Sequence, residues 1–338
     1  MDLITQGALG AILPLSVKKK WTSGQKYHTA LAGFLGMIGG MSADLDVLIN
    51  SDTDPLLFLT YHRHFTHSLI FIPIGGLIIG LLMHWTLGCR CQLKFSQTVF
   101  FCSLGYGTHA LLDATTSYGT LLLWPFIDTR YSLNIISIID PIFTLPLIIS
   151  VSIAAIYNKP YIARFGLAWA LLYFSVGYMQ SKEASQITAN LAISRGHTPL
   201  RSEVKPSFGN IFVWKSIYQT EGKFYIDAMR VGISPKIYEG TSIHKLNLAR
   251  DIPWLSPNSQ QAHDVERFDQ FSDGFTSLDP EDPNRIFDVR YSFVPNEISP
   301  LFSIRLAPGA QFTQHVSFNT HRRNAQKKLR QLWNMIFK

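Results

Sequence analysis

The sequence predicts a mainly α-helical fold: a polytopic membrane domain over residues 1–180, followed by a smaller α+β domain outside the bilayer over residues 181–338. Charge is divided unevenly between these two parts. Of the 30 Lys+Arg and 23 Asp+Glu residues in the chain, residues 1–180 hold only 10 and 8, and no Glu. Long apolar runs fill the first part, whereas short stretches of alternating apolar and polar residues recur in the second. Runs of membrane length predict spans, and alternation predicts strands.

Apolar segments predict six helices in the first part, near 3–17, 29–49, 68–88, 97–112, 135–157 and 162–180. A span needs about 20 mostly apolar residues to cross a hydrocarbon core about 30 Å thick. Segments 68–88, 135–157 and 162–180 meet this requirement well. Segment 97–112 is marginal, 29–49 qualifies only if two aspartates are tolerated, and 3–17 is short. A soluble helical core is the alternative, and three good spans with basic flanks argue against it.

Charges in the loops predict the orientation of these spans. The loops at 18–28, 89–96 and 158–164 carry eight Lys or Arg and no acid, whereas the loops at 50–67 and 113–134 carry two Arg and four Asp. The positive-inside rule places the basic loops in the cytoplasm. With six spans, both termini and the alternate loops then lie outside, in the periplasm of a Gram-negative cell. If the short first segment lies only in the interface, the N-terminus stays inside and the other assignments hold.

The second part carries strand signals. IFVWKSIYQ and KFYIDAMRVG are separated by TEG, which predicts a β-hairpin. IFDVRYSF places four apolar residues on one face, opposite Asp288, Arg290 and Ser292, and LFSIRLA alternates likewise. We therefore expect a compact α+β domain with an antiparallel sheet.

The C-terminal segment HRRNAQKKLRQLWNMIFK predicts a basic amphipathic helix. Its apolar residues fall at helical spacing: Ala325, Leu329, Leu332, Trp333 and Ile336. A basic helix of this kind with Trp is typical of binding to an anionic membrane surface. Nucleic acid is the rival explanation for a pI of 9.2, but a tail tied to a membrane span has little access to it. Membrane lipids are the expected partner, and nucleic acid is not.

Clusters of His and Asp recur at the outer ends of the predicted spans, all on one membrane face in the predicted topology. GGMSADLDVL supplies Asp44 and Asp46, YHRHFTHS supplies His62, His64 and His67, and GYGTHALLDATTSYG supplies His109 and Asp113. His109 and Asp113 are four residues apart and therefore share one face of a helix. Asp44 and Asp46 can converge only if the helix that carries them ends between them.

These residue types predict a metal site. Imidazole plus carboxylate, without thiolate, is a ligand set for Zn, Mn or Fe in hydrolytic or redox sites. Taken singly, a His near a membrane surface is an interfacial polar group and an Asp is a helix cap. Together they need another explanation, because carboxylates at membrane depth are costly without partners. We expect one or more divalent ions, Zn first, with Mn and Fe as alternatives.

The order of four segments resembles a known family. GMSADLDVLI, DPLLFLTYHRHFTHSLIFIP, GYGTHALLDATTSYGTLLLWPF and SIIDPIFTLPL resemble, in this order, the predicted membrane-bound metal-dependent hydrolases of the YdjM type. The resemblance covers roughly residues 1–180, and HR-x-x-TH-S and H-x-L-L-D-x-x-T-S-x-G are its specific motifs. The family is grouped with zinc-dependent phospholipase C and single-strand nucleases. The resemblance therefore implies metal-assisted hydrolysis, with phosphoesters as candidate substrates.

The resemblance also implies which residues bind metal: Asp44, Asp46, His62, His67, His109 and Asp113. Arg63 matches the arginine of the HR motif, whereas His64 occupies a variable place in it. One departure is Thr5-Gln6, where many relatives have a Thr-His pair. Either the site lacks one nitrogen donor, or Gln6 supports the ligands from outside.

Three residues are predicted to act in catalysis, namely Asp44, Arg63 and Asp113. A bound divalent ion lowers the pKa of its water from roughly 15.7 to about 7. Asp44 or Asp113, whichever is not a ligand, would be the general base. The guanidinium fork of Arg63 suits a phosphate or a carboxylate.

We therefore expect an integral protein of the bacterial inner membrane, with its active site and C-terminal domain on the outer face. Its expected activity is hydrolysis of a lipid or lipid-linked phosphoester by a metal-activated water. An ion- or proton-coupled transporter and a non-catalytic scaffold are the alternatives. The substrate, the identity and number of the metals, ester or amide cleavage, and the oligomeric state stay open at this point.

Overall fold

The computed structural model describes residues 1–17, 28–232, 234–321 and 325–338, which form two compact units. The helical unit lies within residues 1–48, 61–178 and 208–210, and the sheet unit lies within residues 49–60, 179–207 and 211–338. Residues 18–27 of the predicted cytoplasmic loop fall outside the described residues.

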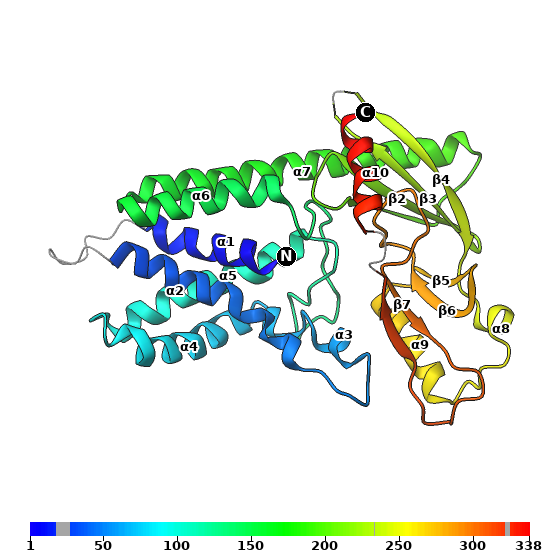
Figure 1. Ribbon diagram of the computed structural model, residues 1–338, viewed down its shortest axis with the longest axis horizontal. Coiled ribbons are helices and arrows are strands. Elements are labelled where there is room, and N and C mark those ends of the chain that lie inside the picture. Colours follow the sequence, from blue (N-terminus) through cyan, green and yellow to red (C-terminus); the bar gives the residue numbers. More distant parts are fainter. Residues whose placement is uncertain (18–27, 233, 322–324) are drawn as a thin grey trace. The chain divides into compact units, whose positions relative to one another are not determined.

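The helical unit consists of helices joined by turns and loops (Figure 1). In chain order they are α1 (Leu3–Ser16), α2 (His28–Ser42), the 3₁₀ helix η1 (Ala43–Leu48), the 3₁₀ turn η2 (Phe65–His67), α4 (Phe71–Met83), the π-helical turn η3 (His84–Gly88), α5 (Phe95–Thr115), α6 (Pro141–Tyr157) and the first part of α7 (Pro160–Ser194). All six predicted helices are present. Helix α7 runs unbroken through residue 180, where the sequence predicted the domain boundary.

Helix α6 begins six residues later than predicted. Asp140 is its N-cap, and Asp140 Oδ1 accepts hydrogen bonds from the backbone N–H groups of Ile142 and Phe143, at 3.1 and 3.3 Å. Pro141 occupies the first helical position, where its missing N–H costs nothing. The hydroxyl of Tyr173 donates to Asp140 Oδ2 at 2.7 Å, so a buried contact with α7 fixes this cap. Residues 135–140 are consequently not helical, and α6 is a short apolar helix of 17 residues.

Helix α5 is the centre of the helical unit rather than a lipid-facing span. Twelve of its residues are buried, and it approaches α2 closely at glycines. A Cβ at Gly105 would lie 1.9 Å from the carbonyl oxygen of Gly36, and one at Gly39 would lie 2.2 Å from that of Cys102. Backbones approach this closely only where side chains are absent, as in many membrane helix pairs. The glycines therefore set the distance between the helices that carry the His and Asp clusters.

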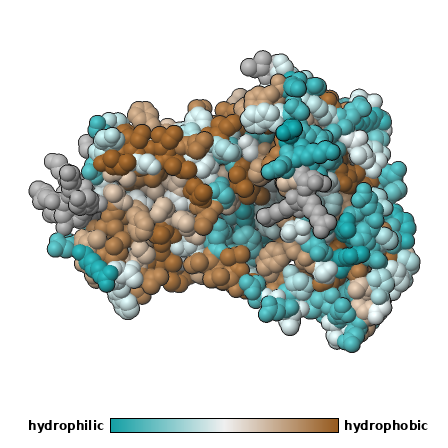
Figure 2. All heavy atoms as spheres, viewed as in Figure 1, coloured by the Kyte–Doolittle hydropathy of each residue, from teal (hydrophilic) through white to brown (hydrophobic). Residues whose placement is uncertain are grey.

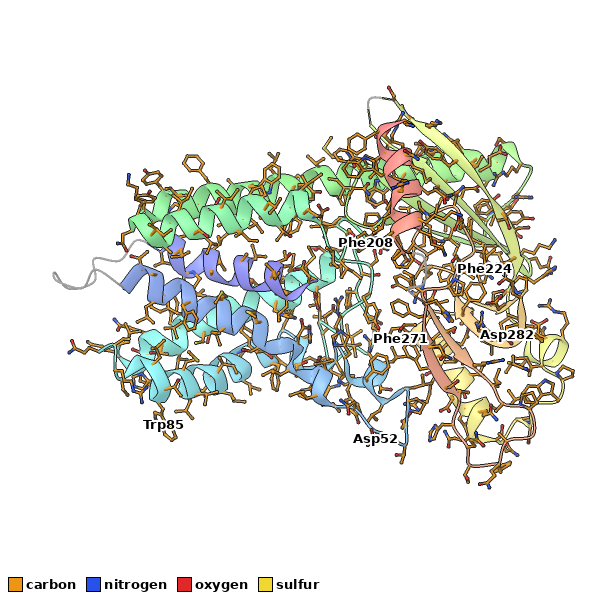
Figure 3. All side chains as sticks on the ribbon, viewed as in Figure 1. Asp52, Trp85, Phe208, Phe224, Phe271 and Asp282 are labelled. Atoms are coloured by element: carbon orange, nitrogen blue, oxygen red, sulfur yellow. The ribbon has the colours of Figure 1, made fainter. Side chains whose placement is uncertain are left out.

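Among the residues that the structure describes, three helical segments are long and apolar enough to cross a membrane, namely Thr29–Leu48, Phe71–Gly88 and Pro160–Ser194. Helices α1 and α6 are apolar but shorter. Figure 2 shows apolar residues over much of the visible surface of these helices. Side chains such as Ile78, Leu82, Ile149, Phe165 and Leu171 are more than half exposed, and Trp85 projects outward (Figure 3). An exposed apolar area of this extent is unfavourable in water and fits contact with lipid.

The described residues of the sheet unit form two antiparallel four-stranded sheets, which confirms the predicted α+β character. The first sheet has the order β1 (Arg201–Pro206), β2 (Val213–Thr220), β3 (Lys223–Arg230), β4 (Lys236–His244), and the second has the order β5 (Thr276–Asp279), β6 (Asp282–Asp288), β7 (Phe302–Arg305), β8 (Ser317–Thr320). The predicted hairpin is β2–β3, with Gly222 at a positive φ of 75° in its turn. The predicted strand over IFDVRYSF ends at Asp288, so residues 289–293 lie outside it.

The helices of this unit are α3 (Leu57–Tyr61), α8 (Leu248–Asp251), α9 (Gln260–Phe271) and α10 (Ala325–Phe337), and residues of α3, α9 and α10 pack into its core clusters. One core cluster joins Phe224 and Ile226 of the first sheet to Phe287 of the second. The predicted amphipathic helix is α10. Its Leu332 and Met335 pack into the core of the sheet unit, while Trp333 and Phe337 are 62% and 64% exposed. The helix therefore has an aromatic surface in addition to its packed face.

Candidate metal centre

The geometry at the end of helix α2 sets the directions of the Asp44 and Asp46 side chains. Helix α2 ends at Ser42, before both aspartates, and residues 43–48 continue as the tighter 3₁₀ helix η1. This differs from the predicted end between Asp44 and Asp46. The two carboxylates do not share one face of η1. Asp44 points towards the histidines of η2 and α5, and Asp46 points towards the backbone and side chains of residues 62–67.

Four side chains converge on one buried point: Asp44, His67, His109 and Asp113. Asp44 Oδ1 lies 3.4 Å from His67 Nε2 and 3.3 Å from His109 Nε2. Asp113 Oδ2 lies 3.3 Å from His67 Nε2 and 3.7 Å from His109 Nε2. The side chain of Asp44 is 22% exposed and the other three are fully buried. Access from solvent is therefore on the Asp44 side.

The two imidazoles are held with their Nε2 atoms facing each other at 2.9 Å. His109 Nδ1 lies 2.5 Å from the carbonyl oxygen of Gly40, which can only accept, so Nδ1 carries the proton. His67 Nδ1 lies 2.9 Å from the Thr66 hydroxyl and 3.2 Å from Asp46 Oδ2, and because that hydroxyl donates to Asp46, a proton on His67 Nδ1 suits both contacts. In neutral rings of this tautomer both Nε2 lone pairs point at one another. Such an arrangement is repulsive unless a cation lies between them, and either a proton on His67 Nε2 or a metal ion would supply it.

The distances fit a tetrahedral ion. Zn–N and Zn–O bonds of about 2.0–2.1 Å place neighbouring ligand atoms of a tetrahedron ~3.3 Å apart. The contacts of 3.3, 3.4 and 3.3 Å match this edge, and those of 2.9 and 3.7 Å bracket it. Asp113 Oδ2 is buried, with Arg63 Nε at 3.0 Å and His67 Nε2 at 3.3 Å. An ion at the centre would take the place of the His67 contact on this oxygen.

Electrostatics also favour a cation at this point. Burial disfavours the charged form of His67, but its hydrogen bonds to Asp113, Asp44 and Asp46 outweigh burial and raise its pKa to about 10. The surrounding carboxylates therefore stabilise positive charge between the two imidazoles. The same field would stabilise a divalent ion.

Asp46 and His62 lie beside this cluster rather than in it. Asp46 Oδ1 lies 2.9 Å from His62 Nδ1, and Asp46 Oδ2 accepts from the backbone N–H of Arg63 at 2.9 Å and from the Thr66 hydroxyl at 3.0 Å. Both of its oxygens are thus occupied. A carboxylate on the outer nitrogen of a metal-binding His orients the ring and raises its basicity. Asp44, Asp46 and His62 also form a group of metal-binding geometry, so a second ion on this side is compatible with the structure.

The backbone of the HR motif is unusual. Arg63 has φ of 59°, the left-handed region that non-glycine residues adopt rarely. This conformation directs its N–H to Asp46, and its carbonyl oxygen accepts from the backbone N–H of Leu121. The Arg63 side chain is 4% exposed, with Nε 3.0 Å from Asp113 Oδ2 and Nη1 donating to the Thr116 hydroxyl at 3.0 Å. In this structure the guanidinium therefore holds Asp113.

Gln6 supports the same carboxylate. Its Nε2 donates to Asp113 Oδ1 at 2.8 Å, and the amino group of Met1 contacts that oxygen as well. Asp113 is consequently fixed from three directions, by Gln6, Met1 and Arg63. Where the sequence left open two roles for Gln6, its geometry is that of a donor outside the four-atom cluster.

His64 is directed elsewhere. Its ring lies 5.6 Å from the ring of Trp124 and 5.8 Å from that of Tyr61. Sequence reasoning did not identify Thr66, Thr116 or the carbonyl of Gly40 as part of the site. The two threonines lie inside the quoted motifs and could have been found there. A main-chain carbonyl leaves no signal in the sequence.

A further group of this composition lies in the sheet unit: Asp54, Asp264 and His315. His315 Nδ1 is 2.9 Å from Asp264 Oδ2. Arg267 lies between the acids, with Nη2 3.0 Å from Asp54 Oδ2 and Nη1 3.3 Å from Asp264 Oδ1. Burial favours the protonated form of Asp54, but the hydrogen bond from Arg267 holds its pKa below the usual value. A side-chain cation already balances these acids.

Comparison with known proteins adds one finding. The family model described as YdjM inner membrane protein matches residues 1–184, more than half of the chain and the whole of the four-residue cluster. No curated protein and no solved structure gives a significant match.

Proposed function

The chain belongs to the family of YdjM inner membrane proteins, and we propose that it is a membrane-bound metal-dependent hydrolase that cleaves a phosphoester of a lipid or lipid-linked substrate. The observation that carries the proposal is the convergence of two imidazole nitrogens and two carboxylate oxygens on one buried point, open to solvent only at Asp44. Imidazole and carboxylate ligands with an accessible side are typical of catalytic rather than structural metal.

When bound, a divalent ion supplies Lewis acidity, which brings the pKa of a water molecule to about 7. The protein's own residues would do the rest. His67 and His109 would offer their Nε2 atoms to the ion, with the Nδ1 protons directed at Asp46 and Gly40. Asp113, fully buried and held by three donors, is suited to binding the ion and not to moving protons. If His67, His109 and Asp113 hold the ion and leave its fourth position to water, Asp44, the accessible acid, is our candidate for the general base.

We assign Arg63 a positioning role first. Its Nε and Nη1 face Asp113 and Thr116, so it fixes the orientation of a ligand carboxylate. The sequence also predicted that the guanidinium fork of Arg63 binds a substrate anion. That role would require Arg63 to reach the accessible side of the site, and it stays a prediction.

The position of the site along the chain supports a lipid substrate. Asp44 lies four residues before the end of the candidate span Thr29–Leu48, and His67 lies four residues before Phe71–Gly88 begins. Both are thus at the ends of apolar helices, where headgroups meet water. A phosphoester at that depth is reachable without extraction of the lipid.

Transport is the second candidate, since buried His and Asp groups also form ion paths. An ion path requires polar groups along the helices. Below the cluster, however, α2, α4 and α5 pack through apolar residues that include Leu35, Ile79, Phe101 and Cys102. This favours a hydrolase with a site at one end of the helices.

The test is metal content beside hydrolysis, both measured on the purified protein in detergent micelles. The wild type should contain at least one divalent transition metal and should release phosphate or a phosphorylated headgroup from a phospholipid. Asp113→Ala should lose metal and activity together. His84→Ala, a histidine of the same helical unit outside the cluster, is the matched control. Activity that persists after complete chelation would refute the metal mechanism.

The proposed orientation has its own test. A C-terminal alkaline phosphatase fusion should be active if the sheet unit is periplasmic, and a green fluorescent protein fusion exported through the Sec pathway should stay dark. The reverse result would place the C-terminus in the cytoplasm and the orientation would be wrong, with the metal proposal unaffected.

A further inference from the structure

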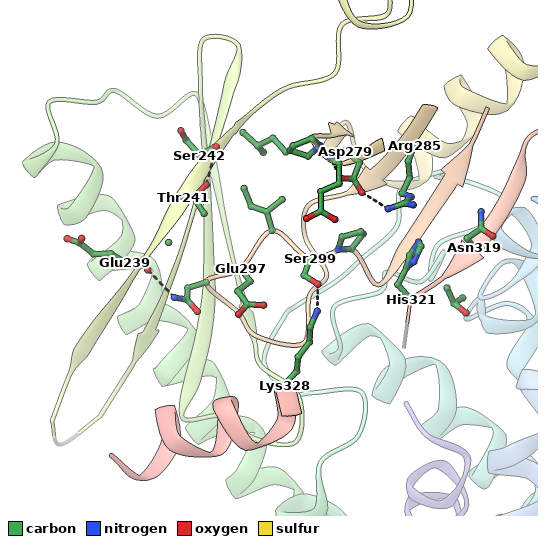
Figure 4. A pocket seen from close by; sticks show the side chains of 18 residues that line it. Glu239, Thr241, Ser242, Asp279, Arg285, Glu297, Ser299, Asn319, His321 and Lys328 are labelled. Atoms are coloured by element: carbon green, nitrogen blue, oxygen red, sulfur yellow. Dashed lines mark hydrogen bonds and ion pairs between the residues drawn. The ribbon is translucent and has the colours of Figure 1, made fainter. Parts of the chain in front are cut away.

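Helix α10 has a packed face and an outward face. Leu332 and Met335 belong to a core cluster of the sheet unit, and Ile336 packs against that cluster. Two apolar residues of the amphipathic pattern, Leu332 and Ile336, are therefore used inside the unit. Lys328 lies on the packed side as well, where its ammonium group contacts the Ser299 hydroxyl (Figure 4). A partner of this helix would therefore meet its other face.

The outward face combines aromatic rings with positive charge. Trp333 and Phe337 are 62% and 64% exposed, and their ring centroids lie 4.5 Å apart. Lys327 and Arg330 are also exposed and precede Trp333 at steps of three residues, which places them on the same side of the helix. Neither cation forms an ion pair with any residue that the structure describes. The chain has no acid after Glu297, so this face suits an anionic surface with an apolar layer beneath it.

The length of α7 indicates where this part of the chain leaves the bilayer. Helix α7 is the candidate span Pro160–Ser194. At 1.5 Å per residue, about 20 residues cross a hydrocarbon core ~30 Å thick, so a core that begins with the helix ends near residue 180. No residue from 165 to 181 is charged, and Lys182 and Glu183 follow. Glu183 is therefore at about headgroup depth.

Hydrogen bonds within the sheet unit connect Glu183 to α10. Glu183 Oε1 accepts from the backbone N–H of Gly232 at 3.3 Å, two residues after strand β3 ends at Arg230. Arg230 Nη1 donates to the carbonyl oxygen of Ile336 at 3.3 Å. The C-terminal turn of α10, which carries both exposed aromatic rings, is consequently held close to the part of α7 that leaves the apolar core.

We propose that the outward face of α10 binds anionic phospholipids of the bilayer, on the leaflet from which α7 emerges. Trp is favoured where headgroups meet acyl chains, and Lys and Arg are attracted to anionic headgroups. The sheet unit would then contact the membrane at a second point besides α7. The proposal does not depend on the proposed hydrolase activity, and it holds for either orientation of the protein.

The experiment measures the depth of α10 in the full-length protein, reconstituted into nanodiscs of phosphatidylglycerol and phosphatidylcholine. A fluorescent label is attached at Asn334→Cys, an exposed position on the outward face. The control label is at Glu221→Cys in the β2–β3 turn, at the opposite end of β3. Cys89 and Cys91 are replaced by Ser, and Cys102 is fully buried. The quencher is a lipid with a nitroxide on the acyl chain just below the headgroup.

The label on α10 should be quenched at least about twofold more than the control label. Lys327→Gln together with Arg330→Gln should lower the ratio of bound to unbound α10 by roughly 30-fold, or about fivefold for each cation. Lys223→Gln together with Lys245→Gln, at the opposite end of β3, is the matched control and should behave like the wild type. Pure phosphatidylcholine should weaken the quenching of the wild type as the loss of the two cations does.

Equal quenching of the two labels would overturn the proposal. So would unchanged quenching in both the Lys327 and Arg330 variant and a variant with Trp333→Ser and Phe337→Ser, each with the melting temperature of the wild type. A label on α10 that is shielded from aqueous iodide, but not quenched by the nitroxide lipid, would also overturn it and would indicate a protein on this face. Because neither metal nor hydrolysis is measured, failure here is distinct from failure of the proposed function.

Discussion

Two groups of His and Asp in this chain have similar composition and different surroundings. In the helical unit, His67 and His109 bring two Nε2 atoms together beside two carboxylates. In the sheet unit, a single imidazole, His315, shares Asp264 with Arg267. The first group directs two imidazole nitrogens at one point between its acids, whereas in the second a guanidinium lies between the acids. Composition alone does not distinguish them. The difference lies in the partners of the outer imidazole nitrogen and in the presence of a guanidinium between the acids.

The largest expected effect is on metal content. His67→Ala removes one of four converging atoms and the ring that Asp46 orients, so the purified variant should lose nearly all its metal. His315→Ala should retain the wild-type amount, because Arg267 balances the acids of its group. Both contents are measured by mass spectrometry after detergent purification. Equal loss in the two variants, or no loss in His67→Ala, would remove the distinction between the groups.

A second contrast concerns buried cations. Carboxylates raise the pKa of His67, whereas burial lowers that of Lys215 to about 7 and outweighs the opposing charge of Asp288. Lys215 lies on β2, with Nζ 2.8 Å from the Ser292 hydroxyl and 3.2 Å from the carbonyl oxygen of Glu297. Because its folded pKa lies below the unfolded value of 10.5, the unfolded chain binds the extra proton between pH 7 and 10.5. Stability should therefore rise with pH across this window, and the cost of Lys215 is largest below pH 7.

Lys215→Met tests this sign. The melting temperature of Lys215→Met minus that of the wild type should be largest at pH 7 and below. The difference should shrink by the equivalent of about 3 kcal/mol towards pH 10. Lys236→Met, an exposed lysine of β4, is the control and should show no such trend. A constant difference between Lys215→Met and the wild type from pH 7 to 10 would mean that Lys215 keeps its charge when buried.

The next effect separates the metal cluster from its surroundings. Asp46→Asn keeps the size of the side chain but places an amide where Asp46 accepts from Arg63, Thr66 and the ring of His67. Removing such an outer carboxylate lowers metal affinity by roughly 10–100-fold. Competition with a chelator measures this, and Asp52→Asn, an exposed acid, is the control. Loss as complete as in His67→Ala would show that Asp46 is itself a ligand, and unchanged affinity would show that it does not orient His67.

Much of this arrangement could be predicted from the sequence, for identifiable reasons. Hydropathy located the six helices because lipid and core both select long apolar runs, and the spacing of His109 and Asp113 placed them on one face of α5. The sequence did not show the start of α6 at Pro141, because the buried contact between Asp140 and Tyr173 is remote in the chain. It also did not separate Asp46 from the converging atoms, since that depends on the 3₁₀ geometry of η1 and on the left-handed Arg63.

The smallest expected effect would challenge the comparison most directly. Arg267→Gln leaves Asp54 and Asp264 without their shared cation. Because Arg267 and Asp54 are partly exposed, the loss should be only about 1 kcal/mol, seen as a small fall in melting temperature. Arg305→Gln, whose more exposed side chain contacts Asp282, is the matched control.

The informative measurement is the metal content of the double variant that carries both His67→Ala and Arg267→Gln. We expect none to be gained, because one imidazole and two acids lack the second nitrogen that His109 supplies in the helical unit. Stoichiometric metal in that double variant would mean that Arg267 had been standing in for an ion, and that the two groups differ only in which cation they hold.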